Sequence, residues 1–292
     1  MYPTPSTLVS RAPLSSGLGE LFLVGTPIGN LGDLSARAVE TLRSVDIVIC
    51  EDTRHSKKLL DAHGLRVAVD SLPAFDEAHR VERYVAAMAQ GKRAALITDA
   101  GMPGISDPGE RLVAEAVAAG IKVTPIPGPC ALVTALAASG LPSARFHFLG
   151  FLPRQKSEAA AMLEEVRALR ATLVLYEGPT RVVETLHALN QALGPRRACV
   201  ARELTKLHED FQRGSLVELA QHFENQEPRG EFVVVVEGHQ GDSRWSQAQV
   251  LEALGAALKA GGRHKEVASD VAQVSGWSKT DLYRLALGLK GS

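Results

Sequence analysis

Short apolar runs, each followed by a turn and then an amphipathic helix, constrain the fold of this chain more than any other feature. The runs are largely continuous in apolar residues, which is typical of strands that are covered on both faces of a parallel sheet. Strands that alternate with helices in this way predict an α/β fold. In the first half of the chain we expect strands at 21–25, 46–50, 94–98 and 122–126.

Amphipathic helices are expected between these strands. The first helix begins at Asp33 or Ser35, because both side chains are favourable N-caps. The other helices of this half are expected at 56–63, 77–90, 109–120 and 131–139.

The strand–helix pattern breaks over 141–153, where Pro142, Gly150 and Pro153 lie close together. We place a domain boundary there. The chain is then expected to divide into a disordered tail at 1–20, an N-terminal α/β domain at 21–140, a C-terminal α/β domain at 150–238 and a helix-turn-helix-like tail at 245–292.

The C-terminal domain is expected to hold a mixed sheet, because some of its strands follow one another without long crossovers. Its strands are expected at 172–176, 198–202 and 232–237, its helices at 155–170, 181–193 and 216–223, and a turn at 213–215. The tail helices are expected at 246–260, 264–274 and 278–289.

Composition restricts the function classes. Lys plus Arg number 32 and Asp plus Glu number 33, so the formal net charge is −1. A protein that coats itself with nucleic acid would be more basic, and any RNA must therefore bind local patches. The three cysteines are far apart and form no C-x-x-C pair, which favours a reducing, cytoplasmic compartment without a structural zinc site. No apolar run approaches the roughly 18 residues that span a bilayer.

Three loops rich in glycine and proline follow the expected strands, at 25–30, 99–109 and 127–131. In an open α/β sheet, ligands bind beyond the carboxyl ends of the strands, so these loops are candidate ligand contacts as well as turns. The chain lacks both the G-x-G-x-x-G fingerprint after its first strand and the phosphate-binding loop of NTPases. By themselves, the loops indicate an α/β enzyme with a nucleotide-like ligand.

Motifs in a fixed order carry a more specific signal. They stand at 26–31, 51–54, 99–101, 105–109, 127–131, 150–153, 176–177, 201–206 and 230–231. On these motifs the chain resembles the tetrapyrrole methylase superfamily of S-adenosylmethionine-dependent transferases. Within that superfamily it is similar to the bacterial ribosomal RNA small subunit methyltransferase I family, which methylates a cytidine 2′-hydroxyl in the decoding region of 16S rRNA.

The resemblance implies two α/β domains with the methyl donor, S-adenosylmethionine, bound between them, a homodimer and no metal. A carboxylate such as Asp99 can hold hydroxyl or ammonium groups of this donor, and Met102 departs from the small polar residue usual in the family. The implied donor-binding residues are Pro27, Ile28, Asp99, Ala100, Gly101, Met102, Ser106, Cys130, Ala131, Tyr176 and Glu177.

Two strand-end segments bring carboxylates beside cations and supply candidate catalytic residues. We expect Arg54, Arg202 and Lys206 to hold RNA phosphate or a developing alkoxide. Asp52 or Glu203 would orient or accept the hydroxyl proton. The alternative is that these residues form salt bridges across a domain or dimer interface.

RNA contacts depend on local basic residues, which can equally form a solvated face. His55 and His63 are interpreted as surface residues. The basic candidates are Arg154, Lys156, Arg196, Arg197, Arg263, His264, Lys265, Lys279, Arg284 and Lys290. Two other functions stay open: a C-methyltransferase of tetrapyrrole precursors, and a non-catalytic RNA-binding protein of ribosome assembly.

Overall fold

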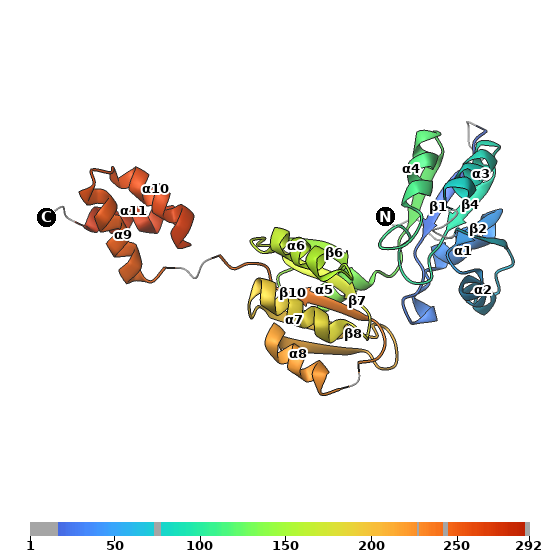
Figure 1. The fold of residues 1–292 in the computed structure, drawn as a ribbon. Coiled ribbons are helices and arrows are strands. Elements are labelled where there is room, and N and C mark those ends of the chain that lie inside the picture. The colour runs from blue at the N-terminus through green and yellow to red at the C-terminus, as the bar shows by residue number, and fades with distance from the viewer. Residues whose placement is uncertain (1–16, 73–76, 227, 242–244, 290–292) are drawn as a thin grey trace.

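A computed structural model describes residues 17–72, 77–226, 228–241 and 245–289 of the chain (Figure 1). The sequence expectation for most of residues 1–20, and that for Lys290, lies outside these ranges. In the described residues no helix is both long enough and apolar enough to cross a membrane.

The first sheet is entirely parallel, with strand order β3-β2-β4-β1-β5. Its strands are β1 (Glu20–Val24), β2 (Ile47–Cys50), β3 (Ala68–Ser71), β4 (Arg93–Leu96) and β5 (Lys122–Ile126). The intervening segments are a 3-10 turn η2 (Leu31–Asp33), α1 (Ala36–Ser44), α2 (Thr53–Ala62), α3 (Glu77–Ala89) and α4 (Glu110–Ala118).

Both faces of this sheet are covered, as the continuous apolar strands predict. Phe22 packs with Leu42 of α1 and Leu59 of α2 on one face. Leu21, its neighbour in β1, packs with Met88 of α3 on the other face. Adjacent strand residues point to opposite faces, so one strand contributes side chains to an apolar core on each face of the sheet.

The second sheet is mixed, with strand order β6-β7-β10-β8-β9, and the expectation of a mixed sheet is confirmed. Its strands are β6 (Phe146–Phe151), β7 (Thr172–Glu177), β8 (Arg197–Arg202), β9 (Asp210–Ser215) and β10 (Phe232–Val236). The helices that follow its strands are α6 (Lys156–Val166), α7 (Val182–Leu193) and α8 (Leu216–Glu224), and they cover one face.

The other face of the second sheet is covered by α5 (Ala131–Ala138), which follows the last strand of the first sheet. Leu132 and Leu136 of α5 pack against Val174 of β7 and Val233 of β10. This helix therefore follows β5 of the first sheet along the chain but packs on the second sheet (Figure 1).

The structure contains strands that the sequence pattern did not reveal. These are β3, β6 and β9, and each lies at the edge of its sheet. Edge strands bury less apolar surface, so they lack the continuous apolar signature of central strands. The turn expected at 213–215 is instead the end of β9, where Ser215 also begins α8 through a capping box with Glu218.

The helical tail consists of α9 (Gln247–Lys259), α10 (His264–Ser275) and α11 (Lys279–Gly288), close to the expected ranges. It has its own apolar core, in which Leu254 of α9, Val271 of α10 and Leu282 of α11 are buried. Ser278 caps α11 by accepting a hydrogen bond from the backbone N–H of Asp281.

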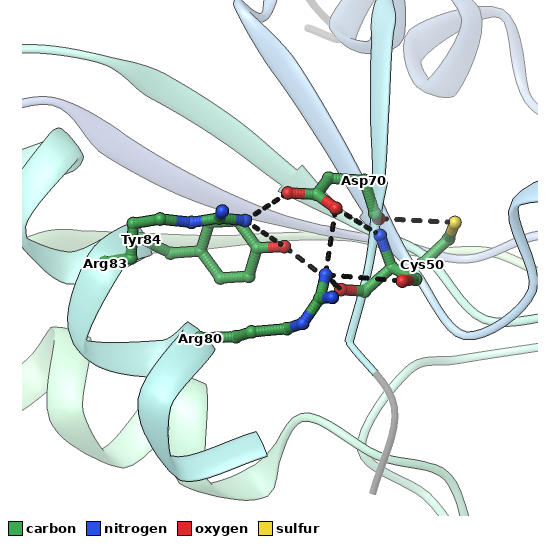
Figure 2. Close-up of polar contacts among 6 residues, drawn as sticks. Cys50, Asp70, Arg80, Arg83 and Tyr84 are labelled. Carbon is green, nitrogen blue, oxygen red and sulfur yellow. Dashed lines mark hydrogen bonds and ion pairs between the residues drawn. The ribbon is translucent and has the colours of Figure 1, made fainter. Parts of the chain in front are cut away.

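A polar cluster fastens the edge strand β3 to α3 (Figure 2). Asp70 pairs with Arg83 and, at 3.0 Å, with Arg80, and the Tyr84 hydroxyl donates to the carbonyl oxygen of Ser71 at 3.1 Å. Partial burial alone would raise the pKa of Asp70, but hydrogen bonds and the two guanidinium groups outweigh it, and the pKa lies below its ordinary value. The cluster holds together an edge that has little apolar packing.

We predict that Asp70→Asn lowers the free energy of unfolding by about 1–2 kcal/mol at pH 7, because the charged acceptor of two arginines is lost. Because the pKa of Asp70 is lower in the folded than in the unfolded state, its carboxylate stabilises the fold at pH values above the unfolded pKa of about 4. This contribution disappears as the pH falls through the pKa of Asp70 in the folded state. Urea unfolding at pH 7 and pH 3 should therefore show a difference from the parent protein that shrinks in acid.

Asp61→Asn is the matched control. Asp61 lies 3.8 Å from Arg66 and both side chains are largely exposed, so its substitution should change stability by less than about 0.5 kcal/mol. Equal effects of the two substitutions would show that the cluster does not stabilise the edge.

Candidate functional site

The three loops rich in glycine and proline meet at the carboxyl edge of the first sheet. Thr26 and Gly101 form an isolated β-bridge, with N···O distances of 2.9 and 3.2 Å. A side chain at Gly25 would lie 2.6 Å from Cα of Gly128, and one at Gly128 would lie 2.7 Å from Cα of Gly25. The loops after β1 and β5 can approach this closely only because both positions are glycine.

A cavity of about 350 Å³ opens between these loops and the second sheet. This volume lies within the usual range for small-molecule sites. The predicted donor-binding residues that line it are Ile28, Ala100, Gly101, Met102, Ser106, Cys130, Ala131, Tyr176 and Glu177. We call it the first cavity.

A second cavity, of about 310 Å³, adjoins the first and shares Ile28, Ala100 and Glu231 with it. Two predicted donor-binding residues, Pro27 and Asp99, line this cavity. The remaining lining residues are Gly29, Leu31, His55, Lys58, Leu59 and Lys206.

Aromatic side chains form the second-sheet wall of the first cavity. Tyr176 packs edge-to-face against Phe148 and Phe151, with ring centroids 4.9 and 5.7 Å apart. Its hydroxyl accepts a hydrogen bond from the backbone N–H of Leu132, in the first turn of α5, at 3.2 Å. Burial raises the pKa of Tyr176, so the phenol stays neutral and this wall is a rigid apolar surface.

Glu177 turns its carboxylate into the second domain. It is 3% exposed, and its oxygens accept from the Thr185 hydroxyl at 2.6 Å and from the Gly178 N–H at 2.8 Å. Arg181 lies 3.6 Å away. Because protein groups already satisfy this carboxylate, Glu177 shapes the wall of the first cavity.

Carboxylates gather where the two cavities meet the loop after β4. Burial raises the pKa of Asp107, which lines the first cavity, and the nearby charge of Asp99 adds to this effect. The pKa of Glu51 is raised by burial and then by Asp99 and Asp107. Asp99 Oδ1 is buried and has no hydrogen-bond partner among the described residues. The local field therefore favours a positively charged ligand.

Lys206 is held in the second cavity by two carboxylates. Its Nζ lies 2.8 Å from Oε1 of Glu203 and 3.1 Å from Oε2 of Glu231. Burial would lower the pKa of Lys206, but these hydrogen bonds raise it above its ordinary value, so the side chain is an ammonium at neutral pH. The same contacts outweigh burial at Glu203 and lower its pKa.

The backbone around Lys206 is strained. Glu203 and Thr205 adopt positive φ angles of 50° and 65°, which residues other than glycine rarely adopt. Opposite this turn, a Cβ at Gly29 would lie 2.4 Å from Cγ of Lys206. Strain of this kind persists where the surrounding structure fixes it, and it accompanies functional sites.

The other predicted catalytic residues, all of which the structure describes, do not line either cavity. Asp52 caps α2 and accepts hydrogen bonds from the backbone N–H and the guanidinium of Arg54. These hydrogen bonds lower the pKa of Asp52 to about 2. The side chain of Arg54 is 87% exposed. Arg202 lies 3.9 Å from Asp210, beside the Glu203 turn. A catalytic role for these residues stays a prediction.

Several cavity residues were not selected from the sequence. Asp107 stands in the motif at 105–109, and its place in the same strand-end loop as Asp99 was the available signal. His55 and Lys58 were missed because a helix period alone does not show which face of α2 meets the other domain. Leu204, Glu231 and Phe232 were missed because they reach the first cavity from the second sheet.

Residues 20–220 match the family of Tetrapyrrole (Corrin/Porphyrin) Methylases. A Mesorhizobium japonicum protein named ribosomal RNA small subunit methyltransferase I is 44% identical over 272 residues, which cover 92% of this chain and 92% of that protein. This chain belongs to the ribosomal RNA small subunit methyltransferase I family. The resemblance inferred from the motifs is confirmed.

A Thermotoga maritima protein with the methyltransferase I name is 42% identical over 221 residues, which cover 76% of this chain and 99% of that protein. Among solved structures, a crystal structure of diphthine synthase has a TM-score of 0.61 at 18% identity and covers 75% of this chain and 90% of that one. This likeness supports the fold alone, and the predicted fold class is confirmed.

In this methyltransferase I family member, we predict that Gly128→Ala separates the loops after β1 and β5. Its Cβ would meet backbone atoms that cannot turn aside, at a cost of about 1–3 kcal/mol. Amide hydrogen exchange at Thr26 and Gly101, the partners of the β-bridge, should become about tenfold faster.

Gly255→Ala in α9 is the control, because nothing lies within 4 Å of a Cβ at that position. It should leave exchange at Thr26 and Gly101 unchanged and stabilise α9 slightly. Unchanged exchange in the Gly128 variant would mean that the glycine contact does not hold the loops together.

Proposed function

We propose that this chain transfers a methyl group from S-adenosylmethionine to the 2′-hydroxyl of a cytidine in 16S ribosomal RNA of the small subunit. The observation that carries the proposal is the pair of adjoining cavities, one apolar and acidic, the other lined by both lysines and carboxylates. Two cavities that share lining residues provide places for a donor and an acceptor side by side. The names of the relatives identify ribosomal RNA of the small subunit as the acceptor to test.

The residues of the first cavity fit the proposed donor. Met102 and Tyr176 offer apolar surface to an adenosine, and the glycine loop after β4 leaves backbone accessible. Asp107 and the unsatisfied oxygen of Asp99 provide negative charge near this loop. When bound, S-adenosylmethionine supplies a methyl group on a positively charged sulfonium, which such carboxylates attract.

The protein residues around the second cavity align and activate the acceptor hydroxyl. Lys206 is an ammonium at neutral pH, so it stabilises negative charge on the hydroxyl oxygen and does not remove the proton. Glu203 positions that ammonium, and its lowered pKa makes it a weak base. The carboxylates that line this cavity, Asp99 and Glu231, are the groups that can accept the hydroxyl proton.

Further parts of the proposal concern the surroundings of the enzyme. A cytoplasmic location agrees with the free cysteines, of which Cys50 and Cys199 are buried. We expect a homodimer, as in the superfamily that the sequence resembles. The tail, with its separate core and exposed Arg263 and Lys265, is proposed to contact RNA away from the cavities.

The proposed function is tested by incubating the protein with methyl-labelled S-adenosylmethionine and small subunits from a strain that lacks the corresponding gene. Label should enter one cytidine ribose of 16S rRNA, located by mapping 2′-O-methyl sites. Label in a tetrapyrrole precursor offered in parallel would identify a small-molecule methyltransferase. Absence of donor binding by calorimetry, together with RNA binding, would identify a non-catalytic assembly protein.

We predict that Lys206→Met lowers kcat about 100-fold, because the cation that stabilises the developing oxyanion is removed. The Kd of S-adenosylmethionine should stay within about twofold, since Lys206 lines only the second of the two cavities. Turnover and calorimetric donor binding are measured separately. Lys92→Met, at an exposed position outside both cavities, is the control, and parent-like turnover of the Lys206 variant would remove Lys206 from the mechanism.

A further inference from the structure

Two exposed basic side chains of α2, His55 and Lys58, line the second cavity and lie one helical turn apart. In the described part of the chain, neither forms a hydrogen bond or ion pair through its side chain. Lys206, the other basic residue of this cavity, is already paired with Glu203 and Glu231. Among the described residues, an anion bound in this cavity would therefore find unpaired basic side chains only on the side formed by α2.

The acidic groups of the cavity are placed differently. Asp99 comes from the loop after β4, and Glu231 comes from the second domain and is 74% exposed. A phosphate bound beside these carboxylates would be repelled, whereas a phosphate beside Lys58 would gain an unshared cation. A nucleotide in this cavity would thus place its phosphate toward α2 and its hydroxyl toward Asp99, Glu231 and Lys206.

The cavity also offers apolar surface to a nucleoside. Leu31, at the start of η2, is 52% exposed and lines this cavity together with Pro27 of the preceding loop. The volume of the second cavity, about 310 Å³, lies within the range of small-molecule sites. It shares Ile28, Ala100 and Glu231 with the first cavity, so a ribose here would adjoin the donor.

We propose that the second cavity holds the acceptor nucleotide and that Lys58 binds a backbone phosphate next to the methylated ribose. This inference rests on the proposed function and assigns a binding residue to it. The net charge of the chain is −1, so binding of the RNA strand depends on local contacts of this kind.

The test compares Lys58→Gln with Lys57→Gln. Lys57 is the preceding residue of α2, is also exposed and does not line the second cavity, so the two variants lose the same charge from the same helical turn. The substrates are unmethylated small subunits and, for equilibrium binding, a single-stranded RNA oligonucleotide that contains the mapped cytidine. Thermal unfolding of each variant establishes that it is folded.

Lys58→Gln should weaken oligonucleotide binding and raise the KM for small subunits, each about tenfold, because a charge-assisted contact is lost. The slope of log K against log salt should decrease by about 0.7 in magnitude, the value for one phosphate of a single strand. Donor affinity should stay unchanged. Lys57→Gln should match the parent protein, and Lys58→Arg, which keeps the charge, should recover most of the binding.

Equal behaviour of Lys58→Gln and Lys57→Gln, whether both match the parent or both weaken binding, would overturn the assignment of Lys58 to a local phosphate. The proposed function would survive that result if the parent protein still methylates 16S rRNA. A parent protein that methylates no RNA in small subunits would overturn the proposed function and the inference with it.

Discussion

The contact between Gly25 and Gly128 is the constraint on which the rest of the site depends. It lets the loops after β1 and β5 touch through their backbones, and the bridge from Thr26 to Gly101 adds the loop after β4. On the side of the first sheet, the glycines let the main chain of these loops lie close together beside the cavities. The second domain completes the enclosure through Tyr176, whose hydroxyl accepts from the first turn of α5.

Charge is distributed unevenly across the two cavities. Asp107 and Asp99 make the region around the loop after β4 acidic, and burial, with a smaller contribution from the charge of Asp99, raises the pKa of Asp107. Within the second domain, the Lys206 ammonium is paired with the carboxylates of Glu203 and Glu231, whereas the Lys58 side chain pairs with no carboxylate of the described residues. A cationic donor and an anionic acceptor strand would therefore be attracted to different parts of one continuous site.

The sequence predicted the parallel sheet, the mixed sheet and the glycine- and proline-rich loops at the carboxyl edge of the first sheet, because central strands and glycine-rich turns have strong local signatures. It did not reveal β3 and β6, since edge strands such as these pack on fewer neighbours and tolerate polar residues. Residues of the site that come from α2, such as Lys58, could not be selected, because their use depends on where the second domain lies. Lys206 and Glu203 form a salt bridge, as in the alternative reading of these residues, but the bridge lies within the second domain and not across an interface.

The placement of α5 has a consequence for how the chain folds during its synthesis on the ribosome. The parallel sheet has all its strands once Ile126 has been synthesised, and domains generally fold as units from the N-terminus during translation. Leu132 and Leu136, however, find their packing partners only after β7 and β10 have emerged. A nascent chain can thus complete its first sheet early, whereas the cavity between the two domains is complete only after β10 has been synthesised.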